Sequence, residues 1–187
     1  MIAVRVNVGP SIMLRSGAWF DFLDPRSSGF TIEDIAHGLA NICRYSGQCS
    51  SFYSVAEHSL LVSESAVGHE REALMHDAAE AFLGDVTRPL KQLLPEFKKI
   101  EREVEIAILE RFELCYPLSP AIKQADLRVL AAEQAQIMPA GANSWAEASG
   151  VEPAPIRVRH LSPDDAYREF LARFEMLMAE RPRRKLA

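Results

Sequence analysis

The spacing of hydrophobic positions changes near residue 30. Residues 2–8 alternate apolar and polar side chains, a period of two that is typical of a β-strand. Two apolar stretches, 11–14 and 18–23, flank Arg15-Ser16-Gly17, and this arrangement predicts a short hairpin. We therefore expect residues 1–30 to form a small β element or an ordered arm, and not an independent domain.

From Thr31 onward the apolar positions recur with helical spacing. Thr31 with Asp34, and Ser54 with Glu57, match the N-cap pattern that starts a helix. The pattern predicts helices from residue 31 to about 44–48, from residue 54, and over residues 70–83, 97–114, 119–137 and 162–180. A loop or irregular turn is expected over residues 86–91, because Pro89 disfavours helical backbone at the residue before it.

These elements predict one all-α domain, a helical bundle with a short N-terminal β element. Its expected parts are an N-terminal arm (1–30), a helical core (31–138), an irregular loop (139–161) and a C-terminal helix (162–180). The segment 139–155 is rich in Ala, Gly, Ser and Pro, and is interpreted as a lid, a dimer contact or a plain loop.

Ionisable side chains concentrate in the stretch from Ala73 to Asp85, on an otherwise apolar helical background. If residues 70–83 form one helix, His76, Asp77 and Glu80 share a sector of about 100°. The residues above and below them in that sector are small, which leaves space for an ion or a substrate. A solvated helix edge with an ordinary His-Asp pair is the simpler interpretation, but burying several carboxylates near a core without a cation is costly.

Composition narrows the function classes. The chain has 187 residues, of which 48% are hydrophobic and 25% are charged, as in one soluble globular domain. A net charge of -5 argues against a nucleic-acid polymer as partner. Three cysteines argue against a disulfide framework and favour the cytoplasm. We expect no membrane partner, because no apolar run approaches the roughly 20 residues that span a bilayer.

Four ionisable residues in apolar helical surroundings form a candidate metal site: His58, His76, Asp77 and Asp126. Two imidazoles and two carboxylates suit a divalent transition ion, and they come from three predicted helices. Such a site keeps coordination positions open for water and a substrate oxygen. Bound water can fall from a pKa of about 15.7 to roughly 7, which provides hydroxide at neutral pH.

The order His58, His76-Asp77, Asp126 resembles the H…HD…D signature of the HD-domain metal-dependent phosphohydrolases. Flanking residues strengthen the resemblance to the nucleotide-hydrolysing branch, which includes bacterial 5′-deoxynucleotidases and phage-type dATP triphosphohydrolases. The matching stretches lie between roughly residues 14 and 138, and are Cys43-Arg44-Tyr45-Ser46-Gly47, Tyr53-Ser54-Val55-Ala56-Glu57-His58-Ser59, His76-Asp77-Ala78-Ala79-Glu80, Gly84-Asp85, Pro89-Leu90-Lys91 and Lys123-Gln124-Ala125-Asp126.

The resemblance implies an HD-domain helical fold, one divalent metal ion (Mn, Co or Mg) and hydrolysis of a phosphate ester or anhydride on a small-molecule nucleotide. The residues themselves also suit Fe, Zn or Ni. The resemblance implies metal ligation by His58, His76, Asp77 and Asp126, and catalytic roles for Glu80 and Asp85 in orienting or deprotonating water. Phosphate contacts are implied for Arg44, Lys91 and Lys123.

Elementary chemistry agrees with these roles and also leaves alternatives. Lys123 lies one helical turn before Asp126 and so faces the same side, and the planar fork of Arg44 suits phosphate. Arg44 and Lys91 are alternatively solvated loop ends. Glu80 is alternatively a brace for a ligating histidine, and Asp85 a turn cap.

Two residues depart from the family pattern. The monophosphatase branch often carries Trp beside the phosphate-binding arginine, where this chain has Tyr45, and Arg88 adds a cation to the loop before Pro89. Both residues bear on which sugar, base or number of phosphates is accepted.

We expect a (deoxy)nucleoside 5′-monophosphate phosphatase or a dNTP triphosphohydrolase. The alternatives are a non-catalytic regulatory protein that retains the metal site, and a phosphodiesterase. A helical bundle whose last helix has an apolar side is also compatible with a homodimer.

Overall fold

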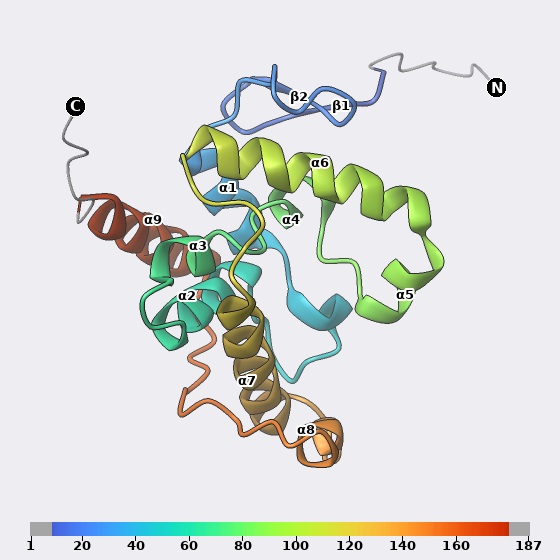
Figure 1. Cartoon of the computed structure of the whole chain (residues 1–187), viewed down its shortest axis with the longest axis vertical. Coiled ribbons are helices and arrows are strands. Elements are labelled where there is room, and N and C mark those ends of the chain that lie inside the picture. The colour runs from blue at the N-terminus through green and yellow to red at the C-terminus, as the bar shows by residue number, and fades with distance from the viewer. Residues whose placement is uncertain (1–8, 180–187) are drawn as a thin grey trace.

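The computed structural model describes residues 9–179, so the strand expected over residues 2–8 lies outside the described residues. The described chain is mostly helical, with one short two-stranded antiparallel sheet near its N-terminus. In Figure 1 this hairpin lies over the α1 and α6 end of the molecule, and α7 and α8 lie at the opposite end. The predicted all-α architecture with a short N-terminal β element is confirmed at this level.

The hairpin pairs β1 (Ser11–Met13) with β2 (Trp19–Asp21), as the sequence predicted, with Ile12 opposite Phe20. Phe20 is fully buried, and its ring stacks on that of Phe82 with the ring centroids 4.1 Å apart. Burial of this aromatic pair fixes the hairpin on the helical body, because stacked aromatic rings contribute beyond their buried area.

The helices follow the predicted order with shifted boundaries. Thr31 closes a complete capping box with Asp34, and the Ser54 hydroxyl accepts from the Glu57 backbone N–H at 3.1 Å. The helical elements are α1 (Ile32–Asn41), the 3₁₀ turn η1 (Arg44–Gly47), α2 (Val55–Ser65), α3 (Glu70–Leu74), α4 (Glu80–Leu83), α5 (Arg88–Leu93), α6 (Pro95–Arg111), α7 (Pro120–Ile137), α8 (Ser144–Ala148) and α9 (Pro163–Ala179).

The capping box expected at Ser54 is only half formed. The Glu57 carboxylate does not return to its own helix N-terminus. It is fully buried and accepts from the backbone N–H groups of Arg159 at 2.6 Å and Leu161 at 2.8 Å. This glutamate therefore ties the segment before α9 to the start of α2, a long-range use that local sequence spacing does not reveal.

The continuous helix predicted over residues 70–83 is wrong. Turns separate α3 from α4, and their backbone hydrogen bonds span three residues, as from Ala78 N to Met75 O (3.1 Å) and from Glu80 N to Asp77 O (2.9 Å). The tighter winding changes the angular relation of His76 and Asp77 from that of a regular helix. Buried Leu74, Met75 and Ala78 hold this winding, because tertiary packing outweighs helix propensity.

Three further boundaries differ from the predictions. The first helix ends at Asn41, and not at about residues 44–48 as predicted. The expected loop or irregular turn over residues 86–91 contains the start of α5, because Pro89 lies in the first helical turn, where its missing N–H is not needed. The expected irregular loop 139–161 contains the short helix α8.

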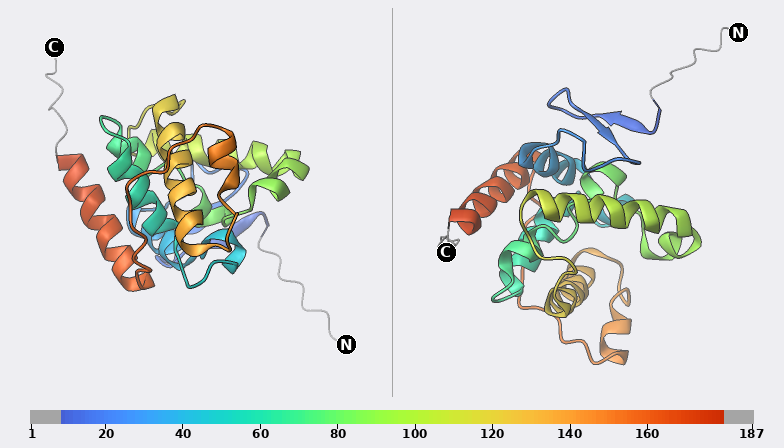
Figure 2. Two further views of the ribbon diagram at one scale, coloured as in Figure 1. Left: turned by 90° about the horizontal axis from the view of Figure 1, so that it is seen from below. Right: turned by 45° about the horizontal axis from the view of Figure 1, so that its top comes forward.

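Buried apolar side chains form two core clusters, and α2 contributes to both. The main core includes Phe20, Leu39, Leu60, Leu74, Ile108 and Phe170. The second core lies beneath α7 and includes Tyr53, Leu61, Val62, Ile122 and Val129. Every residue from Val55 to Ser63 on α2 is buried. Helix α9 packs along α1 and α2, and Figure 2 shows it along one side of the molecule.

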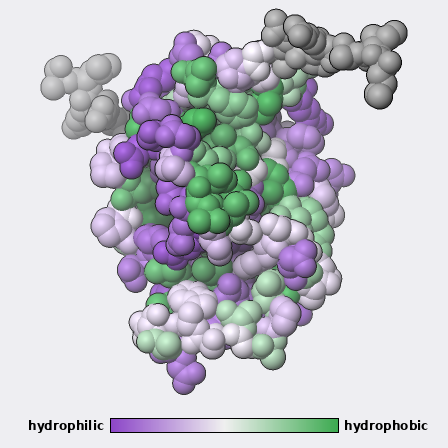
Figure 3. Space-filling model, turned by 90° about the vertical axis from the view of Figure 1, so that its right-hand side faces the viewer, coloured by the Kyte–Doolittle hydropathy of each residue, from purple (hydrophilic) through white to green (hydrophobic). Residues whose placement is uncertain are grey.

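Apolar surface is also exposed on the α5 side. Figure 3 shows this side of the molecule, with hydrophobic residues gathered near its centre and polar residues around them. Helix α5 lies on this side in Figure 1, and its Leu90 and Leu93 are 48% and 76% exposed. Within residues 9–179 no helix is both long enough and apolar enough to cross a membrane.

We predict that Gly38→Ala destabilises the protein, because α1 and α4 touch at this glycine. A Cβ at Gly38 would lie 2.6 Å from the Ala81 carbonyl oxygen and 2.9 Å from the Ala81 Cα. Overpacking costs about 1–3 kcal/mol, which exceeds the gain in helix propensity of up to about 1 kcal/mol. Urea unfolding measures the change. Gly29→Ala is the control, because its Cβ would meet Ala18 Cβ only at 4.0 Å. Unchanged stability of Gly38→Ala would contradict the close contact.

Candidate metal centre and adjoining cavity

The structure brings together the four side chains predicted as metal ligands. His58 comes from α2, Asp126 from α7, and His76 and Asp77 from the turns between α3 and α4. One ligand atom each of His58, His76 and Asp126 lie within 4.8 Å of one another. Asp77 Oδ2 lies 3.2 Å from His76 Nε2 and 3.5 Å from His58 Nε2. These side chains could hold one metal ion between two helices and a turn.

Each imidazole is oriented by a hydrogen bond at its Nδ1 atom. His58 Nδ1 lies 2.6 Å from Glu133 Oε1, and His76 Nδ1 lies 2.8 Å from the Ala73 carbonyl oxygen. Because both acceptors need a proton from Nδ1, the lone pair of each neutral ring is on Nε2. Both Nε2 atoms are buried and have no hydrogen-bond partner among the described residues. Two buried, unpartnered nitrogens facing carboxylates are the arrangement expected of metal ligands.

Glu133 is a buried carboxylate that the sequence analysis missed. It lies on α7, two turns after Asp126, and is 0% exposed. Besides His58 it accepts from the Tyr53 hydroxyl at 2.5 Å and the Tyr45 hydroxyl at 2.8 Å. The available signal was its spacing of seven residues from Asp126, which puts both on one face of a helix.

The charges around Glu133 account for its ionisation. Burial alone raises its pKa, but positive His58 and Arg44, together with hydrogen bonds from His58 and Tyr53, lower the pKa to about 2. Burial and Arg44 act to lower the pKa of His58, and the surrounding carboxylates of Glu133, Asp126 and Asp77 raise it well above its ordinary value. The carboxylates around His58 thus favour a positive charge at this position.

Arg44 points into the same site from η1. Its Nη1 lies 3.6 Å from Asp77 Oδ2, and its Nη2 lies 3.4 Å from Glu133 Oε2. The next two residues, Tyr45 and Ser46, have positive φ angles of 57° and 52°. Left-handed backbone at two successive non-glycine residues is strained, and such strain gathers at functional sites. The Tyr45–Glu133 hydrogen bond helps to hold this turn and therefore the direction of Arg44.

Glu80 and Lys91 form an ion pair beside the metal candidates. Glu80 Oε1 accepts from Lys91 Nζ at 3.0 Å, and Lys91 also donates to Glu101 Oε1 at 2.6 Å. Glu80 Oε2 is buried without a hydrogen-bond partner among the described residues. Burial, followed by repulsion from Asp77 and Asp85, raises the pKa of Glu80 to about 8. A carboxyl group with this pKa exchanges protons near neutral pH.

Lys123 faces Asp126, as their spacing predicted. Its Nζ lies 2.6 Å from Asp126 Oδ2 across one helical turn, and the lysine side chain is 60% exposed. The contact places a positive charge against the outer oxygen of a candidate ligand.

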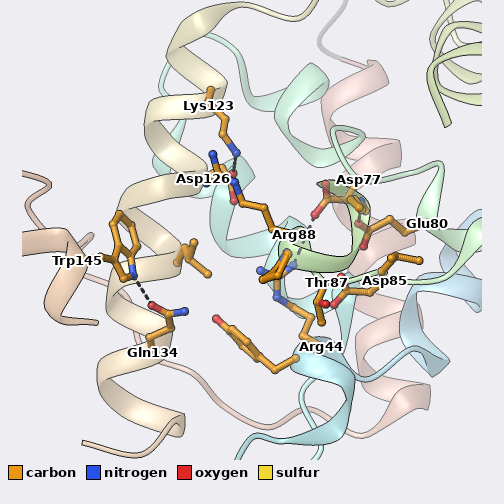
Figure 4. Close-up of a pocket in the computed structure, with 15 residues that line it drawn as sticks. Arg44, Asp77, Glu80, Asp85, Thr87, Arg88, Lys123, Asp126, Gln134 and Trp145 are labelled. Atoms are coloured by element: carbon orange, nitrogen blue, oxygen red, sulfur yellow. Dashed lines mark hydrogen bonds and ion pairs between the residues drawn. The ribbon is translucent and has the colours of Figure 1, made fainter. Parts of the chain in front are cut away.

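A cavity of about 560 Å³ opens beside these groups (Figure 4). Among the predicted site residues its walls include Arg44, Tyr45, Asp77, Glu80, Asp85, Arg88, Lys91, Lys123 and Asp126. The remaining lining residues were not predicted as site residues from the sequence, and are Val86, Thr87, Pro89, Leu130, Gln134 and Trp145. The volume falls within the range typical of small-ligand pockets, about 300–1,000 Å³.

Comparison with known proteins gives the family. No protein-family model matches the chain. The chain is 38% identical over 164 residues to the uncharacterized protein YfdR of Escherichia coli (strain K12), in a match that covers 87% of this chain and 92% of YfdR. The chain belongs to the YfdR family. The chain is also 37% identical over 185 residues to an uncharacterized protein of Rhodobacter capsulatus, in a match that covers 87% of this chain and 93% of that protein.

Proposed function

We propose that this YfdR-family chain is an HD-domain phosphohydrolase that uses one divalent metal ion to hydrolyse nucleotides. The substrate is a (deoxy)nucleoside 5′-monophosphate or a dNTP. The observation that carries the proposal is the pair of buried, unpartnered Nε2 atoms of His58 and His76, which face Asp77 and Asp126 at the edge of a cavity lined with cations. A purely structural metal site would need neither the cavity nor the cations.

The residues present fit a divalent ion. His58, His76, Asp77 and Asp126 would hold it, and their mixed nitrogen and oxygen donors suit Mn, Co, Fe, Zn or Ni, with Mg as the oxygen-preferring alternative. When bound, the ion supplies a coordinated water of lowered pKa and polarises a phosphoryl oxygen. Glu133 and the Ala73 carbonyl keep both imidazoles in the tautomer that this requires.

Positive side chains around the cavity bind and neutralise the phosphate. Arg44 offers a planar fork from η1, Lys91 a point charge from α5, and Lys123 a third cation from α7. Arg88, in the first turn of α5, lines the same cavity and adds a charge for further phosphates. Fixed cations of this kind stabilise the charge that develops on phosphoryl oxygens during transfer.

Glu80 is the proton acceptor in this proposal. Its Oε2 is buried at the cavity wall without a hydrogen-bond partner among residues 9–179, so it is free to accept a proton from the attacking water. Lys91 positions the carboxylate by holding its other oxygen at 3.0 Å. Asp85 lines the cavity beside Glu80 and, by repulsion, helps keep the pKa of Glu80 high.

One assay tests the function. Purified protein supplied with Mn or Co is offered dNMPs, dNTPs and cyclic nucleotides, and released phosphate, pyrophosphate, triphosphate and ring-opened nucleotides are quantified. Phosphate from dNMPs indicates a monophosphatase, triphosphate from dNTPs a triphosphohydrolase, and opening of cyclic nucleotides a phosphodiesterase. Metal-dependent release from none of them, with metal still bound, would contradict catalysis and favour a regulatory protein.

We predict that Glu80→Gln lowers kcat by about 10²-fold, because the amide cannot accept the proton of water. Metal affinity, measured by calorimetry, should stay within a few fold. Glu101→Gln is the matched control, since it removes the other carboxylate on Lys91, at 2.6 Å, and leaves Glu80 in place. Equal loss of kcat in both variants would indicate that Lys91, and not proton transfer to Glu80, limits the rate.

A further inference from the structure

The cavity wall that lies away from the carboxylates is lined by aliphatic, amide and aromatic side chains. Leu130 and Gln134 line it from α7, and Trp145 lines it from α8. The indole Nε1–H donates to Gln134 Oε1 at 2.6 Å, which fixes the orientation of the ring. Figure 4 shows Trp145 and Gln134 on one side of the cavity, and Asp77, Glu80 and Asp85 on the other.

Helix α7 connects the two sides of the cavity in a regular way. Asp126, Leu130 and Gln134 all line the cavity and follow one another at four-residue intervals, so they lie along one helix face. At about 1.5 Å per residue, Gln134 lies about 12 Å along the axis from Asp126. A phosphate held near Asp126 thus leaves room along this face for the organic part of its ester.

Trp145 is not needed to fill either core. Neither Trp145 nor Leu130 is among the side chains of the two core clusters in the described part of the chain. Helix α8 is instead anchored by Ala146, which is 2% exposed and whose carbonyl accepts from Val151 N at 2.8 Å. A half-buried aromatic ring that lines a cavity and is held by its polar edge can present its face to a ligand.

We propose that Trp145, with Leu130 and Gln134, forms a nucleobase subsite in which the base stacks on the indole ring. This inference rests on the proposed nucleotide substrate and narrows it: the enzyme selects phosphate esters that carry a base over simple sugar phosphates. Leu130 and Gln134 lie within the stretch that carries the family resemblance, roughly residues 14–138, and Trp145 lies beyond it. Stacking on an aromatic side chain tolerates all four bases, so the subsite selects for a base and not for a particular one.

Intrinsic fluorescence tests binding without any turnover. The chain has two tryptophans, and Trp19→Phe leaves Trp145 as the single indole fluorophore. Each of the four deoxynucleosides, which carry a base and no phosphate, is titrated into this variant, and 2-deoxyribose 5-phosphate is titrated in parallel. A saturable change with the deoxynucleosides and none with the sugar phosphate is expected. No change with any deoxynucleoside would overturn the subsite.

Kinetics test the same inference on the reaction. Trp145→Ala should raise KM for dNMPs by about 5- to 150-fold, the equivalent of about 1–3 kcal/mol of stacking. Its kcat/KM for 2-deoxyribose 5-phosphate should stay within about twofold. Trp145→Phe, which keeps a ring but lacks the N–H, should restore most of the affinity.

Two outcomes separate the subsite from the proposed function. An equal loss of kcat/KM on dNMPs and on the sugar phosphate would show that Trp145 acts only through the fold of α8, and would overturn the subsite. A fluorescence response without hydrolysis of any nucleotide would support the subsite and contradict the enzymatic proposal.

Discussion

Alanine at Asp77 is expected to abolish metal binding and turnover together. Asp77 Oδ2 lies 3.5 Å or less from the Nε2 atoms of both His58 and His76, so its carboxylate completes the negative charge at the centre. Its removal takes away one proposed ligand and one of the two carboxylates beside Arg44, so that Arg44 keeps Glu133 at 3.4 Å but its charge near the cation is offset less. Calorimetric titration with Mn measures the binding, and nucleotide hydrolysis at saturating Mn measures the turnover.

Asp164→Ala is the control for the Asp77→Ala prediction. Asp164→Ala removes an exposed aspartate from the first turn of α9 and should leave metal binding and activity unchanged. Metal affinity and turnover near those of the wild type in Asp77→Ala would remove the basis for the metal-dependent mechanism.

Glu133→Ala is expected to lower the free energy of unfolding by about 3–5 kcal/mol, because it breaks a fully buried ionic network by removing one partner. His58, Tyr53 and Arg44 would each lose an acceptor in a region closed to water. Urea denaturation of the metal-free protein measures the change. We also expect metal affinity to fall by about 10- to 100-fold, because His58 loses the group that orients it.

Glu96→Ala provides the comparison for stability. Glu96 pairs with Lys99 at 2.8 Å, and its side chain is 78% exposed. Such a surface pair contributes about 0–1 kcal/mol, so the free energy of unfolding of this variant should be close to that of the wild type. Glu133→Gln, which keeps the volume and an acceptor oxygen, should retain more stability than Glu133→Ala. If Glu133→Ala lowered the free energy of unfolding as little as Glu96→Ala, the buried network would not contribute to the stability of the protein.

Local patterns were sufficient to place most elements of the fold. The capping box at Thr31, the Ser119-Pro120 start of α7 and the hairpin turn depend on residues within a few positions of one another, so they can be read from the sequence. The prediction of a continuous helix over residues 70–83 was wrong because this segment depends on distant residues. Its break depends on which side chains pack from distant segments, and spacing within the segment does not contain that information.

The same distinction applies to the site. His58, His76, Asp77 and Asp126 could be predicted as candidate ligands because ionisable residues in apolar surroundings stand out locally. Glu133 was missed because its importance comes from contacts with residues 75–89 positions earlier in the chain. Trp145 was missed because it lies in a segment whose composition was interpreted as a lid, a dimer contact or a plain loop, without any residue in it being singled out.

The sequence alone thus determined the helical class, the order of most elements and four of the charged or ionisable side chains near the core. These follow from periodicity and from the cost of burying unpaired ionisable groups. Only the tertiary structure decided how these groups face one another: which nitrogen of each imidazole is free, which carboxylate orients His58, and which wall of the cavity is aromatic. The physical reason is that hydrogen bonds and ion pairs act over about 3–4 Å in space, whereas the residues that make them are separated by many turns of the chain.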